Sequence, residues 1–157
     1  HCDVFYIGGT KVGAMFGEAV VFSGMKAPKY FFTNVKRHGA LLAKGRMLGI
    51  QFDTLFTDNL YFKVSQHAIN MAVRICDIFK KHGIAIAYDS PTNQQFIVLP
   101  KRLYEALSQK VAFEIWERKS DEEIVCRFVT SWATKEEELD ELDRILTTLC
   151  GACRDND

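Results

Sequence analysis

Apolar and polar positions in the first third of the chain predict two strands followed by two helices. Apolar runs at 4–7 and 18–22 flank a glycine-containing stretch, which is typical of a strand, a loop and a second strand. Pro28 suits the first turn of a helix, and Gly39 can take the left-handed conformation that ends one. Small residues are frequent in 40–56, which predicts a helix packed closely against another backbone.

The remaining two thirds predict a long helix followed by alternating strands and helices. An apolar stripe with helical spacing runs through 60–81 and stops before Gly83. The later elements are predicted as strands 84–88 and 95–99, helix 101–109, strands 113–117 and 123–130, and helix 135–149. Residues 84–157 therefore predict a small α/β domain with a mainly antiparallel sheet.

Charge and cysteine content argue against several functional classes. Lys plus Arg and Asp plus Glu both total 20, so there is no positive excess of the kind that drives binding to nucleic acids or anionic membranes. No apolar run approaches the roughly 20 residues that a membrane-spanning helix needs. Five scattered cysteines do not form the even framework of a small secreted protein, so we expect a cytoplasmic protein.

The start of the chain predicts that it is part of a longer protein. The first residue is His1, and a core-like strand is already under way at 4–7. We therefore expect a fragment or a partial chain.

Four segments carry a resemblance to a known family. They are residues 3–22, which contain the pair Thr10-Lys11 among glycines, residues 36–46, the pair Thr92-Asn93, and the segment Cys126-Arg-Phe-Val-Thr-Ser-Trp132. Together they resemble the carboxy-terminal half of the low-specificity L-threonine aldolase and β-eliminating lyase family, which are pyridoxal-phosphate (PLP) enzymes of fold type I.

This resemblance implies a fold and an activity. Residues 1–58 would be the end of the PLP-binding large domain, 59–83 a connecting helix, and 84–157 the small carboxy-terminal α/β domain. The reaction would be the cleavage of L-threonine or a related β-hydroxy amino acid to glycine and an aldehyde. The resemblance also implies a homo-oligomer, either a dimer or a tetramer, and an amino-acid substrate.

Lys11 is the candidate catalytic and cofactor-binding residue. A PLP lysine must react as a free amine and must then be displaced by the substrate, which requires room around it. Gly8, Gly9 and Gly13 are expected to supply that room. The alternative is an ordinary solvated loop lysine. Thr10 is a second candidate cofactor-binding residue, although its hydroxyl could simply cap the turn.

Arg127 is the candidate substrate-binding residue. It lies in an apolar strand, where an unpaired charge is costly, and a guanidinium can bind a carboxylate through two parallel hydrogen bonds. The resemblance puts the substrate-carboxylate arginine of the family at this position. The alternative is an ordinary ion pair with Glu114 or Glu117 on the neighbouring strand.

Other chemically suggestive residues receive no role. The basic stretch around residue 39 fits a solvated helix end, and His67 fits a satisfied core or interface histidine. Cys150 and Cys153 have the spacing of a redox motif but follow a helix, and no metal site is predicted. The catalytic base and the residues that bind the phosphate are expected upstream of residue 1.

Two further functions stay open on the sequence alone. One is a PLP-dependent β-eliminating lyase of the same fold, which would use the same lysine and arginine. The other is a non-catalytic α/β interaction module in which the glycine-rich loop is only structural.

Overall fold

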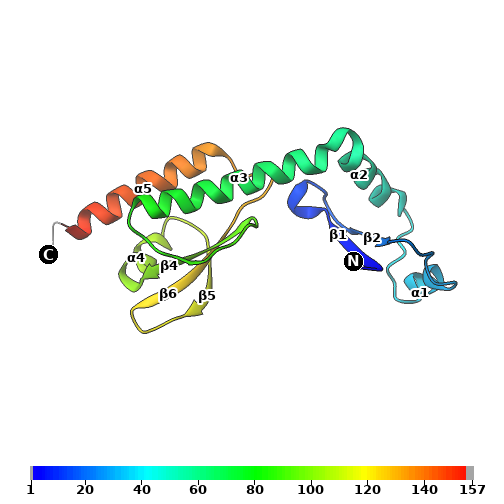
Figure 1. The fold of residues 1–157 in the computed structure, drawn as a ribbon, viewed down its shortest axis with the longest axis horizontal. Helices are drawn as coiled ribbons and strands as arrows, with labels where there is room; N and C mark the ends of the chain where they lie inside the picture. Colours follow the sequence, from blue (N-terminus) through cyan, green and yellow to red (C-terminus); the bar gives the residue numbers. More distant parts are fainter. Residues whose placement is uncertain (1, 155–157) are drawn as a thin grey trace. The chain divides into compact units, whose positions relative to one another are not determined.

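The computed structural model describes residues 2–154, and their side chains up to residue 151. The chain divides into two compact units, one ending at Val64 and the other beginning at Ser65 (Figure 1). The first unit contains β1 (Val4–Gly8), η1 (Thr10–Val12), β2 (Glu18–Phe22), α1 (Phe31–Arg37), α2 (Arg46–Phe56), η2 (Thr57–Asn59) and the start of α3 (Leu60–Lys81). Within residues 2–154, no helix is long and apolar enough to span a membrane.

The two predicted strands of the first unit are confirmed as an antiparallel hairpin. Strands β1 and β2 pair from Val4 opposite Phe22 to Gly8 opposite Glu18. The connection is tightened at its start, because the Gly9 carbonyl accepts hydrogen bonds from the backbone of Val12 at 3.1 Å and of Ala14 at 2.9 Å.

The helix predicted before Gly39 is confirmed as α1, but it begins at Phe31 and not with Pro28 in its first turn. The helix predicted for 40–56 is wrong over its first six residues. Gly39 has a φ of 72°, a left-handed conformation that turns the chain out of the helix. A further turn follows, in which the Gly45 amide donates to the Leu42 carbonyl at 3.1 Å. Helix α2 therefore begins only at Arg46. The many small side chains in 40–56 suggested a continuous helix and gave no sign of these turns.

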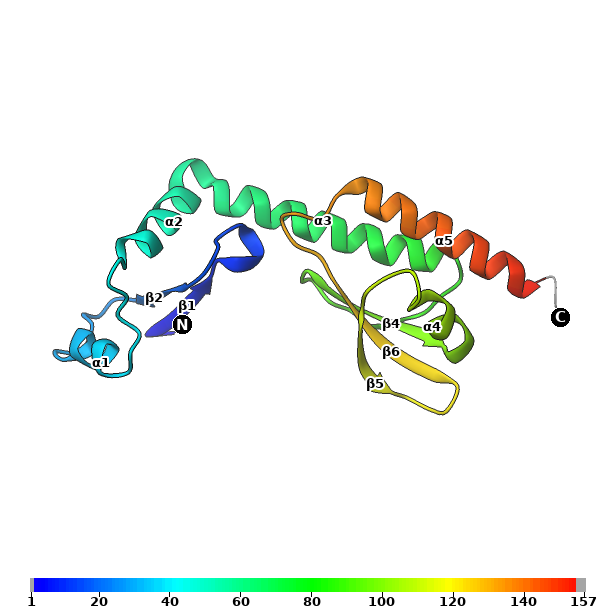
Figure 2. The same cartoon turned by 180° about the vertical axis from the view of Figure 1, so that it is seen from behind.

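The second unit is a four-stranded antiparallel sheet packed against helices, as predicted. It contains most of α3, β3 (Ile86–Tyr88), β4 (Gln94–Pro100), α4 (Lys101–Leu107), β5 (Glu114–Arg118), β6 (Glu123–Val129) and α5 (Glu136–Arg154). The strand order is β3-β4-β6-β5, and every pair is antiparallel. Figures 1 and 2 show α3 and α5 side by side along one face of this sheet.

The core of the second unit lies between the helices and that face. Phe79 of α3, Ile97 of β4, Cys126 of β6 and Leu146 of α5 are fully buried in one apolar cluster, together with Leu107 of α4. This cluster explains why α3 forms over the predicted range 60–81: its apolar stripe has a sheet to pack on.

The opposite face of the sheet carries a different row of side chains. Tyr88, Phe96, Arg127 and Glu114 are successive cross-strand partners on β3, β4, β6 and β5. Because side chains alternate between the two faces of a strand, this row points away from the cluster that contains Ile97 and its partner Cys126.

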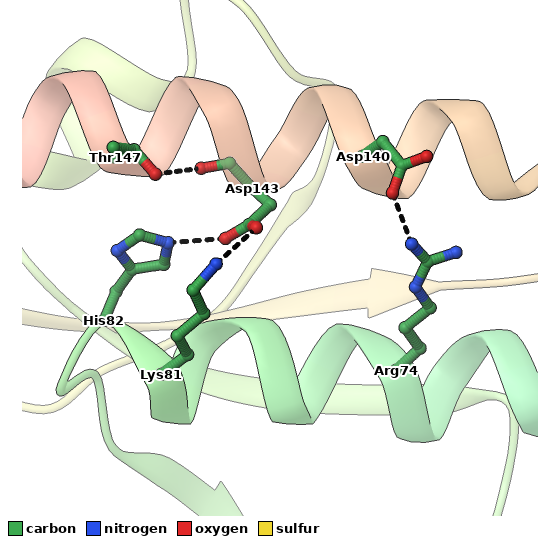
Figure 3. A network of polar contacts seen from close by, with 6 residues as sticks. All are labelled: Arg74, Lys81, His82, Asp140, Asp143 and Thr147. Atoms are coloured by element: carbon green, nitrogen blue, oxygen red, sulfur yellow. Dashed lines mark hydrogen bonds and ion pairs between the residues drawn. The ribbon is translucent and has the colours of Figure 1, made fainter.

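Polar contacts also join α3 to α5 along their exposed sides (Figure 3). Asp143 of α5 accepts hydrogen bonds from Lys81 at 2.6 Å and from the His82 ring at 2.7 Å, and Arg74 of α3 pairs with Asp140 of α5.

Candidate functional site

Lys11 lies in a tight turn whose inner side is packed and whose outer side is open. It is the middle residue of η1, which follows β1 after Gly9. Val12 and Ala14 from the same turn are buried against Leu55, which holds the turn on the small core of the first unit. Lys11 itself is exposed. Alternation between buried and exposed positions therefore presents the lysine amine outward.

The amine of Lys11 has no partner among residues 2–154. Its side chain makes no hydrogen bond and no ion pair with any of them. An unpaired primary amine on a fixed turn is what attachment of an aldehyde cofactor requires. The lysine therefore fits PLP as an attachment point.

The neighbouring glycines differ from one another, and the expectation that all of them supply room is wrong for Gly9. A side chain at Gly8 would meet nothing within 4 Å, so this position does border open space. A Cβ at Gly9 would lie 2.7 Å from the Ala14 Cβ and 3.1 Å from the Phe52 ring. Gly9 is thus a site of close packing, not of room. Gly13 ends the turn in a left-handed conformation with a φ of 100°.

Helix α2 fixes the segment that follows the turn. The side-chain oxygen of Gln51 accepts a hydrogen bond from the Met15 amide at 2.7 Å, and its amide nitrogen donates to the Phe16 carbonyl at 3.4 Å. Sequence patterns did not single out Gln51, because a glutamine in a helix gives no signal of a distant backbone partner.

Thr10, the second candidate cofactor residue, is exposed beside Lys11. Its hydroxyl makes no hydrogen bond to the part of the chain that the structure describes, and the residue at the start of the turn is Gly9. A capping role for Thr10 is therefore not observed, and its contact with a cofactor stays a prediction.

Arg127 lies at the centre of the outward face of the second unit's sheet. Its side chain is 27% exposed, and its guanidinium carbon is 5.4 Å from the centre of the Trp116 ring. Nη1 donates to the Gln94 side-chain oxygen at 3.0 Å, and Nη2 donates to the Glu114 carboxylate. The ion pair that sequence reasoning gave as the alternative is thus present, with Glu114 as the partner.

One donor of this guanidinium is unsatisfied. Arg127 Nε is buried and has no hydrogen-bond partner among the described residues. Glu117, the other acid considered as a partner, instead accepts a hydrogen bond from the Tyr88 hydroxyl at 2.7 Å, which raises the pKa of that hydroxyl. Gln94 and Trp116 are contacts that the sequence did not predict, because they depend on strand register.

Among the other chemically suggestive residues, His67 has a structural partner. The His67 ring lies 2.8 Å from the Thr134 carbonyl, which confirms it as a satisfied histidine. Residues 2–151 contain no group of three or more His, Cys, Asp or Glu side chains that could hold a metal ion. The side chain of Cys153 lies outside the described residues, so the Cys150 and Cys153 pair stays a sequence observation.

Lys11 and Arg127 belong to different compact units. Within its own unit, Lys11 is an exposed amine on a packed turn, and Arg127 is a guanidinium held on an open sheet face.

The chain is similar to known proteins over most of its length. The low-specificity L-threonine aldolase of Pseudomonas aeruginosa is 28% identical over 152 residues, which is 96% of this chain and 43% of that protein. The enzyme of the same name from another Pseudomonas strain is 28% identical over 142 residues, which is 89% of this chain and 40% of that protein. No family model matches the chain.

A solved structure gives the same result. The threonine aldolase of Leishmania major matches with a TM-score of 0.89 and 36% sequence identity, over 94% of this chain and 43% of that chain. The α/β fold with antiparallel sheets is therefore that of the matching part of a threonine aldolase. The chain spans about two fifths of the length of these relatives. In sequence and in structure, this chain is a homologue of the threonine aldolases over nearly all of its own length.

Proposed function

We propose that this chain supplies the cofactor lysine, Lys11, and the substrate-carboxylate arginine, Arg127, of a PLP-dependent aldolase. The enzyme would cleave L-threonine or a related β-hydroxy amino acid to glycine and an aldehyde. The observation that carries this proposal is the unpaired amine of Lys11 on its packed turn, within a segment similar to enzymes named threonine aldolases.

The roles of the two residues follow from their chemistry. PLP, when bound, supplies the electron sink for breaking the bond between Cα and Cβ. The Lys11 amine would attach the cofactor and give way to the substrate's amino group, with open space beside Gly8. The Arg127 guanidinium would bind the substrate carboxylate and so fix which bond at Cα faces the cofactor. Thr10 would contact the cofactor beside Lys11.

The same proposal extends to domains and assembly. Residues 1–58 would belong to the cofactor domain, 59–83 would form a connecting helix, and 84–157 would form the small domain.

Many large apolar side chains in the first unit are exposed, including Phe5, Tyr6, Met15 and Phe32. An exposed apolar surface of this kind favours cover by another protein surface, so we propose a homo-oligomer. The scattered cysteines favour the cytoplasm.

Covalent trapping tests the cofactor role of Lys11. The protein is incubated with PLP, reduced with borohydride and mapped as peptides by mass spectrometry. We expect the phosphopyridoxyl group on Lys11, and only background labelling on Lys26, an exposed lysine of the same unit. Equal labelling of the two lysines would contradict the assignment and favour a non-catalytic module.

Kinetics of two variants test the reaction itself. Lys11→Ala should abolish glycine formation from L-threonine, whereas unchanged formation would exclude Lys11 as the catalytic lysine. Arg127→Gln should raise the KM for the amino acid by about tenfold or more, because a charged hydrogen bond is lost. Ammonia and a keto acid as products, in place of glycine and an aldehyde, would identify a β-eliminating lyase.

A further inference from the structure

The guanidinium of Arg127 is surrounded by three groups of different chemical kinds. Gln94 is a neutral acceptor for Nη1 at 3.0 Å, and the Trp116 ring lies along the guanidinium with 5.4 Å between its centre and Cζ. Glu114 is an anion at Nη2. A neutral acceptor and an aromatic face can hold the guanidinium without neutralising it, whereas the carboxylate of Glu114 neutralises it.

Glu114 makes the contact that a substrate carboxylate would make. It lies directly opposite Arg127 in the pairing of β5 with β6, so its side chain reaches the guanidinium from the neighbouring strand. Its side chain is 67% exposed, against 27% for Arg127. Because Glu114 is on the edge strand of the sheet, it can move into solvent without disturbing packed neighbours. An ion pair with so exposed a partner adds little stability and can be displaced.

The unpaired Nε shows that the contact with Glu114 is incomplete. A guanidinium binds a carboxylate best when two parallel N–H groups point at its two oxygens. Glu114 accepts from Nη2, while Nε is buried without a partner. A free carboxylate that is not tied to a neighbouring strand can align with Nε and Nη2 together, and thereby satisfy a donor that Glu114 leaves unsatisfied.

We propose that Glu114 is an internal competitor for the carboxylate subsite at Arg127. When no amino acid is bound, Glu114 occupies the guanidinium, and an incoming α-carboxylate displaces it. Gln94 and Trp116 are positioning residues that keep the guanidinium in place during the exchange. This inference rests on the proposed function, because it requires that Arg127 bind the substrate carboxylate.

Glu117 provides a matched control. It is on the same strand and carries the same charge, but its carboxylate accepts from the Tyr88 hydroxyl and not from Arg127. The change Glu117→Gln therefore removes one negative charge from the same surface without freeing the guanidinium.

The test is the dissociation constant of glycine, measured by calorimetry on the PLP-loaded protein. Glu114→Gln should tighten glycine binding by about two- to five-fold, the range expected when an exposed ion pair no longer competes. Glu117→Gln should change it by less. In an Arg127→Gln background, Glu114→Gln should have no effect, because the group for which it competes is gone.

The outcomes separate this inference from the function on which it rests. If Arg127→Gln weakens glycine binding while Glu114→Gln leaves it unchanged or weakens it, Glu114 is not a competitor and the role of Arg127 stands. If Glu114→Gln and Glu117→Gln tighten binding equally, the effect is general electrostatics and the inference fails. If Arg127→Gln does not alter glycine binding, the proposed carboxylate subsite is wrong, and the competitor is wrong with it.

Discussion

At the scale of single residues, two adjacent glycines next to Lys11 have opposite surroundings. Gly8 borders open space, whereas a Cβ at Gly9 would collide with Ala14 and Phe52. The Ala14 Cβ is fixed by the backbone and cannot rotate away. Gly9 thus allows the turn to close against the core, and this closure holds Lys11 in its outward position.

The pair gives a matched prediction for Gly9. Gly9→Ala should destabilise the first unit by about 1–3 kcal/mol through overpacking, and should reduce trapping of PLP on Lys11. Gly8→Ala should have little effect on stability, because its methyl group would meet nothing within 4 Å. Denaturant unfolding and the borohydride peptide map would measure both. Equal effects of the two variants would show that packing at Gly9 does not control the turn.

Buried thiols give a second prediction at this scale. Burial raises the pKa of the Cys126 thiol to about 11, so at pH 8 only about one thiol in a thousand is ionised. Cys2 is exposed. Iodoacetamide at pH 8 should therefore modify Cys2 quickly and Cys126 only after denaturation, as read by mass spectrometry. Fast native modification of Cys126 would mean that the sheet opens readily.

At the scale of elements, Asp143 makes polar contacts that join α5 to the end of α3 (Figure 3). Hydrogen bonds from Lys81 and from His82 lower the pKa of the Asp143 carboxyl below its ordinary value of 3.8. A carboxyl group with a lowered folded-state pKa stabilises the fold above its unfolded-state pKa. This stabilisation disappears as the pH falls through the folded-state value, which means below about pH 4.

The corresponding prediction concerns acid unfolding. Asp143→Asn should lower the free energy of unfolding at pH 7 by about 1 kcal/mol or less, because the carboxylate is partly exposed. The same variant should lose less stability than the parent protein between pH 4 and pH 2. Asp77→Asn on α3, where the aspartate has no ion pair within residues 2–154, is the control. If the free energy of unfolding falls equally with pH in Asp143→Asn and in the parent protein, Asp143 does not contribute to acid unfolding.

At the scale of the whole molecule, burial is unevenly divided between the two units. The first unit has a small core of Val12, Ala14 and Leu55, and the second has the large cluster between its sheet and its helices. Most of the exposed large apolar side chains belong to the first unit. Local stability increases with buried apolar contact, so the second unit is expected to be more stable than the first.

Amide hydrogen exchange should detect this difference. In the 157-residue chain, amides of β4 and β6 are expected to exchange at least tenfold more slowly than those of β1 and β2, because only the former lie over a large core. Association of the proposed oligomer should slow exchange in β1 and β2 selectively. Equal protection of both pairs of strands at low protein concentration would contradict this account.

Much of the secondary structure and the candidate lysine were predictable from the sequence. Apolar spacing identified β4, β6 and the extent of α3, because these elements bury one face against a core and so carry a regular pattern. Lys11 followed from the Thr-Lys pair among glycines and from the resemblance of that segment to a known family. The segment 40–45 failed because helix propensity says little about where a left-handed glycine redirects the chain.

Only the tertiary structure decided what surrounds these residues. The sequence identified Arg127 as a cation in an apolar strand, and strand register then chose Glu114 over Glu117 as its partner and added Gln94 and Trp116. Likewise, the sequence determined that glycines flank Lys11, and packing determined that Gly8 is open and Gly9 is filled. Periodicity along a chain reports which face is buried, whereas pairing across strands and the fit of one methyl group depend on residues far apart in sequence.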